Sequence, residues 1–79
     1  DWQWDAGCIK TELVFIDFQT AFAFMSKVAD MAEKLGHHPD WQNSYNRIGI
    51  SLRTHDKNAV TTLDVALAKH ISILYRNCK

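Results

Sequence analysis

Five side chains in the middle of the sequence are of types that transfer protons or bind metals: Glu33, His37, His38, His55 and Asp64. Histidine is the one side chain whose unperturbed pKa, about 6.5, lies near neutrality, so it can act as both acid and base. Two histidines stand next to each other between Gly36 and Pro39. A turn that ends a helix gains nothing structurally from two imidazole rings, so the pair indicates a functional site.

Each of these residues also has a structural interpretation, and for the His37–His38 pair a structural role and a functional role both stay open. Glu33 suits a solvated helix face, and His55 suits a surface loop after a strand. Asp64 and Thr61 match the T-x-x-D pattern of a capping box, which places a carboxylate at the positive end of a helix. His70, in the middle of the last predicted helix, is expected to be packed or to lie at an interface.

Three histidines and two carboxylates could also bind a metal ion. However, zinc sites usually take two ligands from a short spacer such as H-x3-H, or include cysteine. Here the adjacent side chains of a turn tend to diverge, and Cys8 and Cys78 lie at opposite ends of the chain. Metal-free proton transfer between imidazoles and a substrate is therefore the predicted chemistry.

Composition narrows the class of protein. Nine Lys and Arg balance nine Asp and Glu, so the chain lacks the basic surplus that direct nucleic-acid binding needs. The longest apolar run, residues 21–25, is too short to span a bilayer, and no signal peptide is visible. The cysteines have no CxxC spacing and favour a reducing compartment. With 79 residues, we expect a single domain, 1–79, whose thin core favours oligomerisation.

Hydrophobic periodicity predicts the first half of the fold. Residues 8–16 alternate as in a half-buried strand, and a short strand at 1–5 precedes a turn at residues 6–7. Asp17 is expected to cap a helix over 18–35, because the period then changes. The apolar stripe expected to pack on a sheet consists of Phe18, Phe22, Met25, Ala29 and Ala32, with Ala21, Val28 and Leu35 beside them. Gly36 suits the helix end, and Pro39 prevents its continuation.

The second half is predicted to hold strands at 41–45 and 47–55, around a tight turn near Asn46, and a helix at 61–76. The apolar side of this helix is expected to comprise Leu63, Ala66, Leu67, His70, Ile71 and Leu74. The order is β-β-α-β-β-α. Hairpin-length connections then predict an α+β fold, a two-layer sandwich with a four-stranded antiparallel sheet and helices packed on one face.

The spacing of these residues resembles a family signature. Glu33-x3-His37-His38-Pro39, followed by Tyr45, His55 and Asp64, is similar to the motif of pterin-4a-carbinolamine dehydratases. The segments DFQTAFAFM, AEKLGHHPDW, YNRIGISLRTHD and TLDVALA resemble that family's segments in order, over nearly the whole chain. Gly36 departs from relatives that carry a polar residue there, and the family's usual N-terminal helix is expected to be absent from this chain.

The resemblance implies a hydro-lyase that converts 4a-hydroxy-tetrahydrobiopterin to quinonoid dihydrobiopterin in tetrahydrobiopterin recycling, with no metal or redox cofactor. His37 and His55 would exchange protons with the pterin, in roles that stay open between acid and base, and His38 would bind and orient it. The implied supporting residues around the same pocket are Glu33, Pro39, Trp41, Thr54 and Asp64. Neither His37 nor His55 belongs to the expected core.

The resemblance also implies a homodimer or homotetramer, located in the cytoplasm or also in the nucleus. It carries an alternative function as well, a non-enzymatic interaction module that serves as dimerisation cofactor of a transcription factor. That function would work through helix surfaces and not through the histidines.

Overall fold

The computed structural model describes residues 2–78, so Asp1 of the predicted first strand lies outside the described residues. Its elements are β1 (Gln3–Asp5), β2 (Cys8–Val14), α1 (Phe18–Leu35), β3 (Asp40–Ser44), β4 (Arg47–Leu52) and α2 (Thr62–Asn77). This is the predicted β-β-α-β-β-α order. Between residues 2 and 78, no helix is long and apolar enough to cross a membrane.

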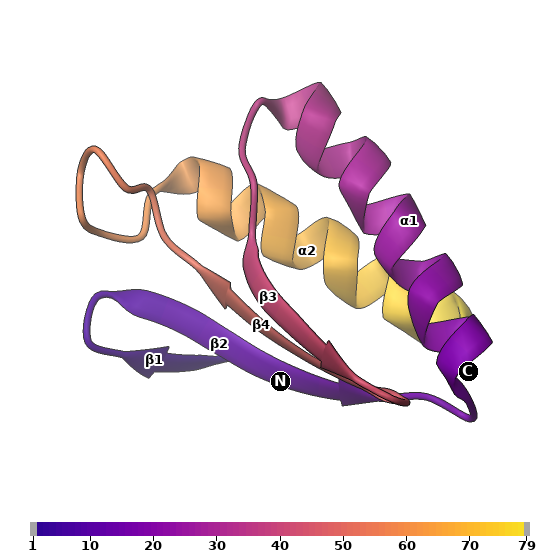
Figure 1. The fold of residues 1–79 in the computed structure, drawn as a ribbon. Helices are drawn as coiled ribbons and strands as arrows, with labels where there is room; N and C mark the ends of the chain where they lie inside the picture. Colours follow the sequence, from indigo (N-terminus) through magenta and orange to yellow (C-terminus); the bar gives the residue numbers. More distant parts are fainter. Residues whose placement is uncertain (1, 79) are drawn as a thin grey trace.

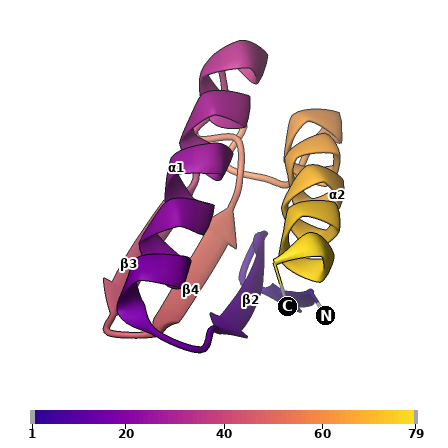
Figure 2. The same cartoon turned by 90° about the vertical axis from the view of Figure 1, so that its right-hand side faces the viewer.

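The four strands form one antiparallel sheet in the order β1-β2-β4-β3. Both helices lie on the same side of this sheet and next to each other, as Figures 1 and 2 show. The predicted two-layer α+β sandwich is thereby confirmed. Because β3 and β1 are the outer strands, the residues just before β3 lie at one edge of the molecule.

Two strands end earlier than their alternating patterns predict. β2 stops at Val14, because Phe15 leaves the ladder and bonds to Asn46 instead. The backbone N–H of Phe15 donates to the Asn46 carbonyl at 2.9 Å, and the side-chain amide of Asn46 donates to the Phe15 carbonyl at 2.8 Å. β4 stops at Leu52, because Thr54 pairs with Ala59 across a tight turn. That turn carries His55 and leads to α2.

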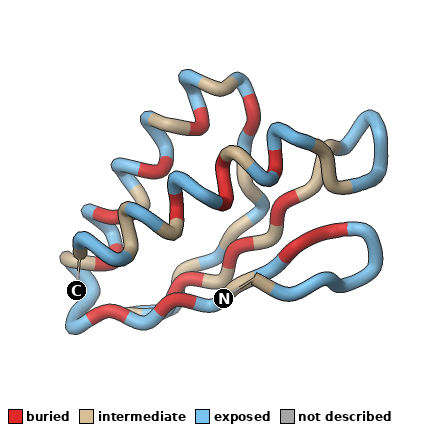
Figure 3. The backbone as a smooth tube through the Cα atoms, turned by 180° about the vertical axis from the view of Figure 1, so that it is seen from behind, coloured by how far each residue is buried: buried red, intermediate tan, exposed pale blue. Residues whose placement is uncertain are grey.

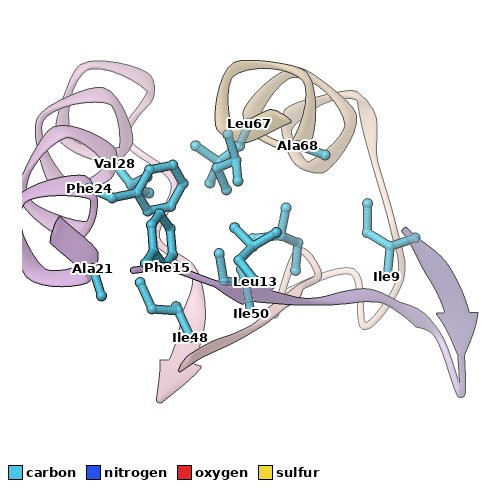
Figure 4. Close-up of a cluster of buried hydrophobic side chains, with 12 residues drawn as sticks. Ile9, Leu13, Phe15, Ala21, Phe24, Val28, Ile48, Ile50, Leu67 and Ala68 are labelled. Atoms are coloured by element: carbon cyan, nitrogen blue, oxygen red, sulfur yellow. The ribbon is translucent and has the colours of Figure 1, made fainter. Parts of the chain in front are cut away.

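The core lies between the sheet and the helices. Along β4, buried residues alternate with half-buried ones, as expected for a strand with one face on the core (Figure 3). The buried apolar side chains from the two layers meet in one cluster, which includes Ile9, Leu13, Ile48, Ile50, Leu52, Phe24, Val28, Leu67 and Ile71 (Figure 4).

The predicted face of α1 is only partly correct: Ala21, Val28 and Ala32 are buried as expected, and Met25 and Leu35 pack against the core, but the two aromatic residues of the predicted stripe do not. Phe18 and Phe22 are 46% and 55% exposed, and Ala29 is exposed too. The buried residues are Ala21, Phe24, Val28 and Ala32. Phe24 is fully buried because its ring packs against Phe15 at 5.0 Å and against Tyr75 at 6.2 Å, between ring centroids. These contacts join α1 to the end of β2 and to α2, so the aromatic cluster selects the face of the helix.

α2 buries Asp64, Leu67, Ala68 and Ile71. Leu63 and His70 flank this stripe and are exposed. Packing of His70 within the chain is therefore excluded, whereas a place at an interface stays a prediction. Cys8 and Cys78 are both free thiols.

Candidate active site

The turn that carries His37 and His38 is fixed by the end of α1. Gly36 adopts the left-handed conformation, with φ 64° and ψ 30°, as its place after the helix predicts. Its N–H donates to the Glu33 carbonyl at 3.2 Å, and the His37 N–H donates to the Ala32 carbonyl at 3.0 Å. The helix therefore ends with paired carbonyls, and the next residues leave in a defined direction.

Replacing Gly36 with alanine is expected to lower the free energy of unfolding by about 1–2 kcal/mol, the cost of a Cβ in the left-handed region. Space is not limiting, because no atom lies within 4 Å of the added Cβ. Asparagine, which tolerates this conformation, should cost less. Gly49→Ala is the control, since its Cβ would make an ordinary 3.5 Å contact with Gln42. Urea unfolding measures all three variants, and equal losses for Gly36→Ala and Gly49→Ala would contradict the assignment.

His37 is buried and paired with a buried carboxylate. Its Nε2 lies 2.5 Å from Oδ1 of Asp64, whose side chain is fully buried. His37 comes from the end of α1 and Asp64 from the first turn of α2, so the contact joins the two helices. Asp64 was expected as a supporting residue without an assigned ring, and the structure places its carboxylate against His37.

Asp64 accepts three hydrogen bonds. Besides His37, it accepts from the backbone N–H of Thr61 at 2.8 Å and from the Thr54 hydroxyl at 2.9 Å. Because the Thr54 hydrogen is used in this way, the Thr61 hydroxyl donates to Thr54 at 2.6 Å. Burial alone would raise the pKa of Asp64, but the bonds from His37, Thr61 and Thr54 outweigh it and lower the pKa below its ordinary value of 3.8. The carboxylate is therefore ionised at neutral pH.

The lowered pKa of Asp64 predicts a pH dependence of stability. A carboxyl group whose folded pKa lies below its unfolded value stabilises the fold above the unfolded value, here about 3.8, and loses that contribution as the pH falls through the folded pKa. Wild type should therefore lose stability in this acidic range more steeply than Asp64→Asn, which has no carboxyl group to titrate. Urea unfolding of both proteins at a series of acidic pH values measures the difference. If the difference in free energy of unfolding between wild type and Asp64→Asn stayed constant with pH, Asp64 would not be the titrating group.

His38 and Glu33 form the second imidazole–carboxylate pair. His38 Nε2 lies 2.5 Å from Glu33 Oε2, and both side chains are largely exposed. Glu33 stands in the last turn of α1, so the helix end holds the ring that follows it. Glu33, which the resemblance implies as a supporting residue, therefore contacts His38, and its role in orienting that ring stays a prediction.

His55 is the first residue of the turn between Thr54 and Ala59. The Thr54 N–H donates to the Ala59 carbonyl at 2.8 Å, and the Asn58 N–H donates to the His55 carbonyl at 3.2 Å. His55 Nε2 lies 3.2 Å from Oδ2 of Asp40, the first residue of β3. The exposed ring is therefore held against the edge strand.

The other expected supporting residues take different places. Thr54 bonds to Asp64 and supports His37 indirectly. Trp41 is half-buried, packs against the core and lies opposite Ile50 in β4. Pro39 is half-buried between the histidine pair and β3. Convergence of the three imidazoles on one pterin-sized space stays a prediction.

A comparison with known families adds to this geometry. The sequence profile described as pterin 4 alpha carbinolamine dehydratase matches residues 1–74. The chain belongs to this family. Three relatives show how closely other members of the dehydratase family match it, and all three are named as candidate pterin-4-alpha-carbinolamine dehydratases.

The relative from Prochlorococcus marinus is 53% identical over 73 residues, which cover 92% of this chain and 77% of that protein. A Synechococcus relative is 51% identical over 73 residues, covering 92% and 78%. The one from Mesorhizobium japonicum is 52% identical over 68 residues, covering 86% and 69%.

Solved structures of this dehydratase family have the same fold. A protein from Brucella melitensis, described as a transcriptional coactivator/pterin dehydratase, superposes with a TM-score of 0.92 at 43% identity, covering 94% of this chain and 81% of that one. A pterin dehydratase-like protein described as a RuBisCO assembly factor in the alpha-carboxysome superposes with a TM-score of 0.77 at 18% identity, covering 95% of this chain and 87% of that one. At this identity the likeness shows the fold alone.

Asp40 is the site residue that sequence reasoning missed in this dehydratase-family chain. Its signal was its position, directly after the His37-His38-Pro39 turn, but the spacing did not indicate which ring it would reach. Asp40 also lines a cavity of about 340 Å³ together with Lys10, Thr11, Trp41, Gln42, Gly49, Ile50 and Ser51. Each of the three candidate site histidines, His37, His38 and His55, therefore contacts one carboxylate. No three His, Cys, Asp or Glu side chains in residues 2–78 could hold a metal ion.

Proposed function

We propose that this protein dehydrates 4a-hydroxy-tetrahydropterins to quinonoid dihydropterins by acid and base catalysis with histidines. The observation that supports it best is the buried His37–Asp64 pair, because a structural turn has no need of an imidazole held 2.5 Å from a buried carboxylate. Membership of the dehydratase family supports a pterin as the class of substrate.

The reaction requires two proton transfers. The bond between the pterin carbon and its hydroxyl oxygen breaks, and an acid protonates that oxygen so that it leaves as water. A base removes the proton from the neighbouring ring nitrogen, whose electrons form the new carbon–nitrogen double bond. No electrons are exchanged with a cofactor, so two imidazoles are sufficient.

The carboxylates determine which nitrogen of each imidazole is available. Ionised Asp64 can only accept a hydrogen bond, so Nε2 of His37 carries the hydrogen that it receives. Nδ1 of His37 is then the nitrogen that can exchange a proton with a substrate. We assign proton exchange to His37 and His55, and pterin orientation to the exposed His38.

A direct assay tests the proposal. Decay of 4a-hydroxy-tetrahydrobiopterin, followed by its ultraviolet absorbance, should be accelerated by the purified protein and not by the heat-denatured protein. Metal chelators should leave the rate unchanged. Equal decay with native and denatured protein would exclude the activity.

A second proposal is an interaction role, favoured by the exposed aromatic residues of α1 and by the Brucella relative described as a coactivator. Phe18 and Phe22 contact each other at 5.9 Å between ring centroids, and Ile16 is exposed nearby in sequence. We assign homo-oligomerisation, or binding of a transcription-factor helix, to this face. Phe22→Ser should reduce the oligomer mass in light scattering and spare the fold. An unchanged mass and unchanged partner binding would argue against this face.

A further inference from the structure

We infer that Asp40 is a positioning residue for His55, which holds this ring in one tautomer and one orientation for proton transfer. The inference rests on the proposed function and assigns a role to the one site carboxylate that the sequence signature did not contain. Its basis is the 3.2 Å contact between Oδ2 of Asp40 and Nε2 of His55.

The two residues come from segments that are fixed separately. Asp40 follows Pro39 and pairs with Ser51 of β4, so its backbone is held by the sheet. His55 is held by the turn that the Thr54–Ala59 bridge closes. Rotation about the side-chain bonds of His55 is the freedom that remains, and the carboxylate removes much of it.

The contact also selects a tautomer. A carboxylate only accepts hydrogen bonds, so the neutral His55 ring carries its hydrogen on Nε2 when it faces Asp40. Nδ1 is then left as the nitrogen that takes up a proton. His37 has the same arrangement toward Asp64, and His38 has it toward Glu33. Each of the three site histidines thus contacts its carboxylate through Nε2.

Exposure separates this pair from a buried structural one. The Asp40 and His55 side chains are both 58% exposed, and exposed ion pairs contribute little to stability. Removing Asp40 should therefore change turnover without changing the unfolding transition. The ion pair between Asp5 and Lys10, at 2.8 Å and similarly exposed, is a matched control because it contacts no site histidine.

The test compares Asp40→Asn, Asp40→Ala, Asp40→Glu and Asp5→Asn with wild type in the pterin decay assay. Asp40→Asn and Asp40→Ala should lower kcat about tenfold, the lower end for loss of a carboxylate that orients a working imidazole, with KM nearly unchanged. Asp40→Glu should restore most of kcat, and Asp5→Asn should equal wild type. A kcat for Asp40→Asn and Asp40→Ala equal to that of wild type would overturn the inference and leave the proposed function in place.

A spectroscopic measurement separates the failure of the two proposals. Long-range ¹H–¹⁵N NMR of neutral His55 should show the hydrogen on Nε2 in wild type and in Asp5→Asn, and on a mixture of both nitrogens in Asp40→Ala. The same mixture in wild type would overturn the inference whatever the turnover. An ordered tautomer in a protein that fails to accelerate pterin decay would refute the proposed function, and the catalytic role of Asp40 with it.

Discussion

The double variant His37→Gln/His55→Ala is expected to lose dehydratase turnover entirely while its chain stays folded. A positioned acid or base contributes about 10²–10⁴-fold, so each single change should lower kcat within that range. Because we assign the exchange of one proton to each of these two imidazoles, their joint loss should leave only the uncatalysed rate. His38→Ala should instead raise KM, since we assign this ring to pterin orientation.

The choice of glutamine at position 37 follows from burial. Alanine would leave Oδ1 of Asp64 buried without its donor, which costs about 1–3 kcal/mol or more for a charged group. A glutamine amide can still donate a hydrogen bond but cannot exchange a proton at neutral pH. His70→Ala is the control, because His70 is exposed on α2 and has no assigned role in catalysis. Circular dichroism verifies the fold, and wild-type turnover by the double variant would disprove the roles of His37 and His55.

Phe24→Ala is expected to be the most destabilising single change in the domain. Its ring is fully buried and contacts Phe15 and Tyr75, so truncation should cost about 3–5 kcal/mol. The total free energy of unfolding of a native domain is only about 5–15 kcal/mol. Much of the Phe24→Ala population should therefore unfold near room temperature in mild urea. Phe22→Ala, two residues away and 55% exposed, should cost far less at low protein concentration.

Urea unfolding followed by tryptophan fluorescence measures both variants. The protein must be dilute because Phe22 lies on the face that we assign to association. A loss of stability caused by weaker association would vary with the protein concentration. Equal, concentration-independent losses for Phe22→Ala and Phe24→Ala would contradict the burial assigned to α1.

The element order could be read from the sequence because its signals are local. Alternation before Val14, the cap at Asp17 and the glycine at position 36 each act within a few residues, and the structure contains all three. The Asp17 side chain accepts the Thr20 N–H at 2.8 Å, as a cap should. The Thr61–Asp64 bond at the start of α2 was likewise predictable from four consecutive residues.

The phase of α1 could not be read in the same way. Its sequence contains two overlapping apolar stripes, one through Phe18 and Phe22 and one through Phe24 and Val28. Which one is buried depends on Phe15, which precedes the helix, and on Tyr75, which is distant from α1 in the sequence. The hydroxyl of Tyr75 also donates to the Val14 carbonyl at 3.0 Å, a contact across 61 positions of the chain that no periodicity indicates.

In the candidate site, too, some features were predictable from the sequence and others needed the tertiary structure. The resemblance implied Glu33 and Asp64 as supporting residues, but which histidine each carboxylate contacts came from the structure. The contact between Asp40 and His55 links the first residue of β3 to the turn that follows β4, 15 positions further along the chain. It exists only because β3 and β4 pair, and therefore needed the tertiary structure.

Asp64 accepts the backbone N–H of Thr61, the N-cap of α2, and is also the partner of His37, so the first helical turn and the imidazole cannot loosen independently. Under the proposed function, fraying of this turn would inactivate a molecule whose sheet is still intact. Heat inactivation would then precede the loss of circular dichroism, and amide hydrogens at residues 64 and 65 would exchange with solvent before those of β4. Ligand that holds His37 in place would slow that exchange. Under the proposed function, the temperature at which activity is lost would then be set by one helical turn and not by the core.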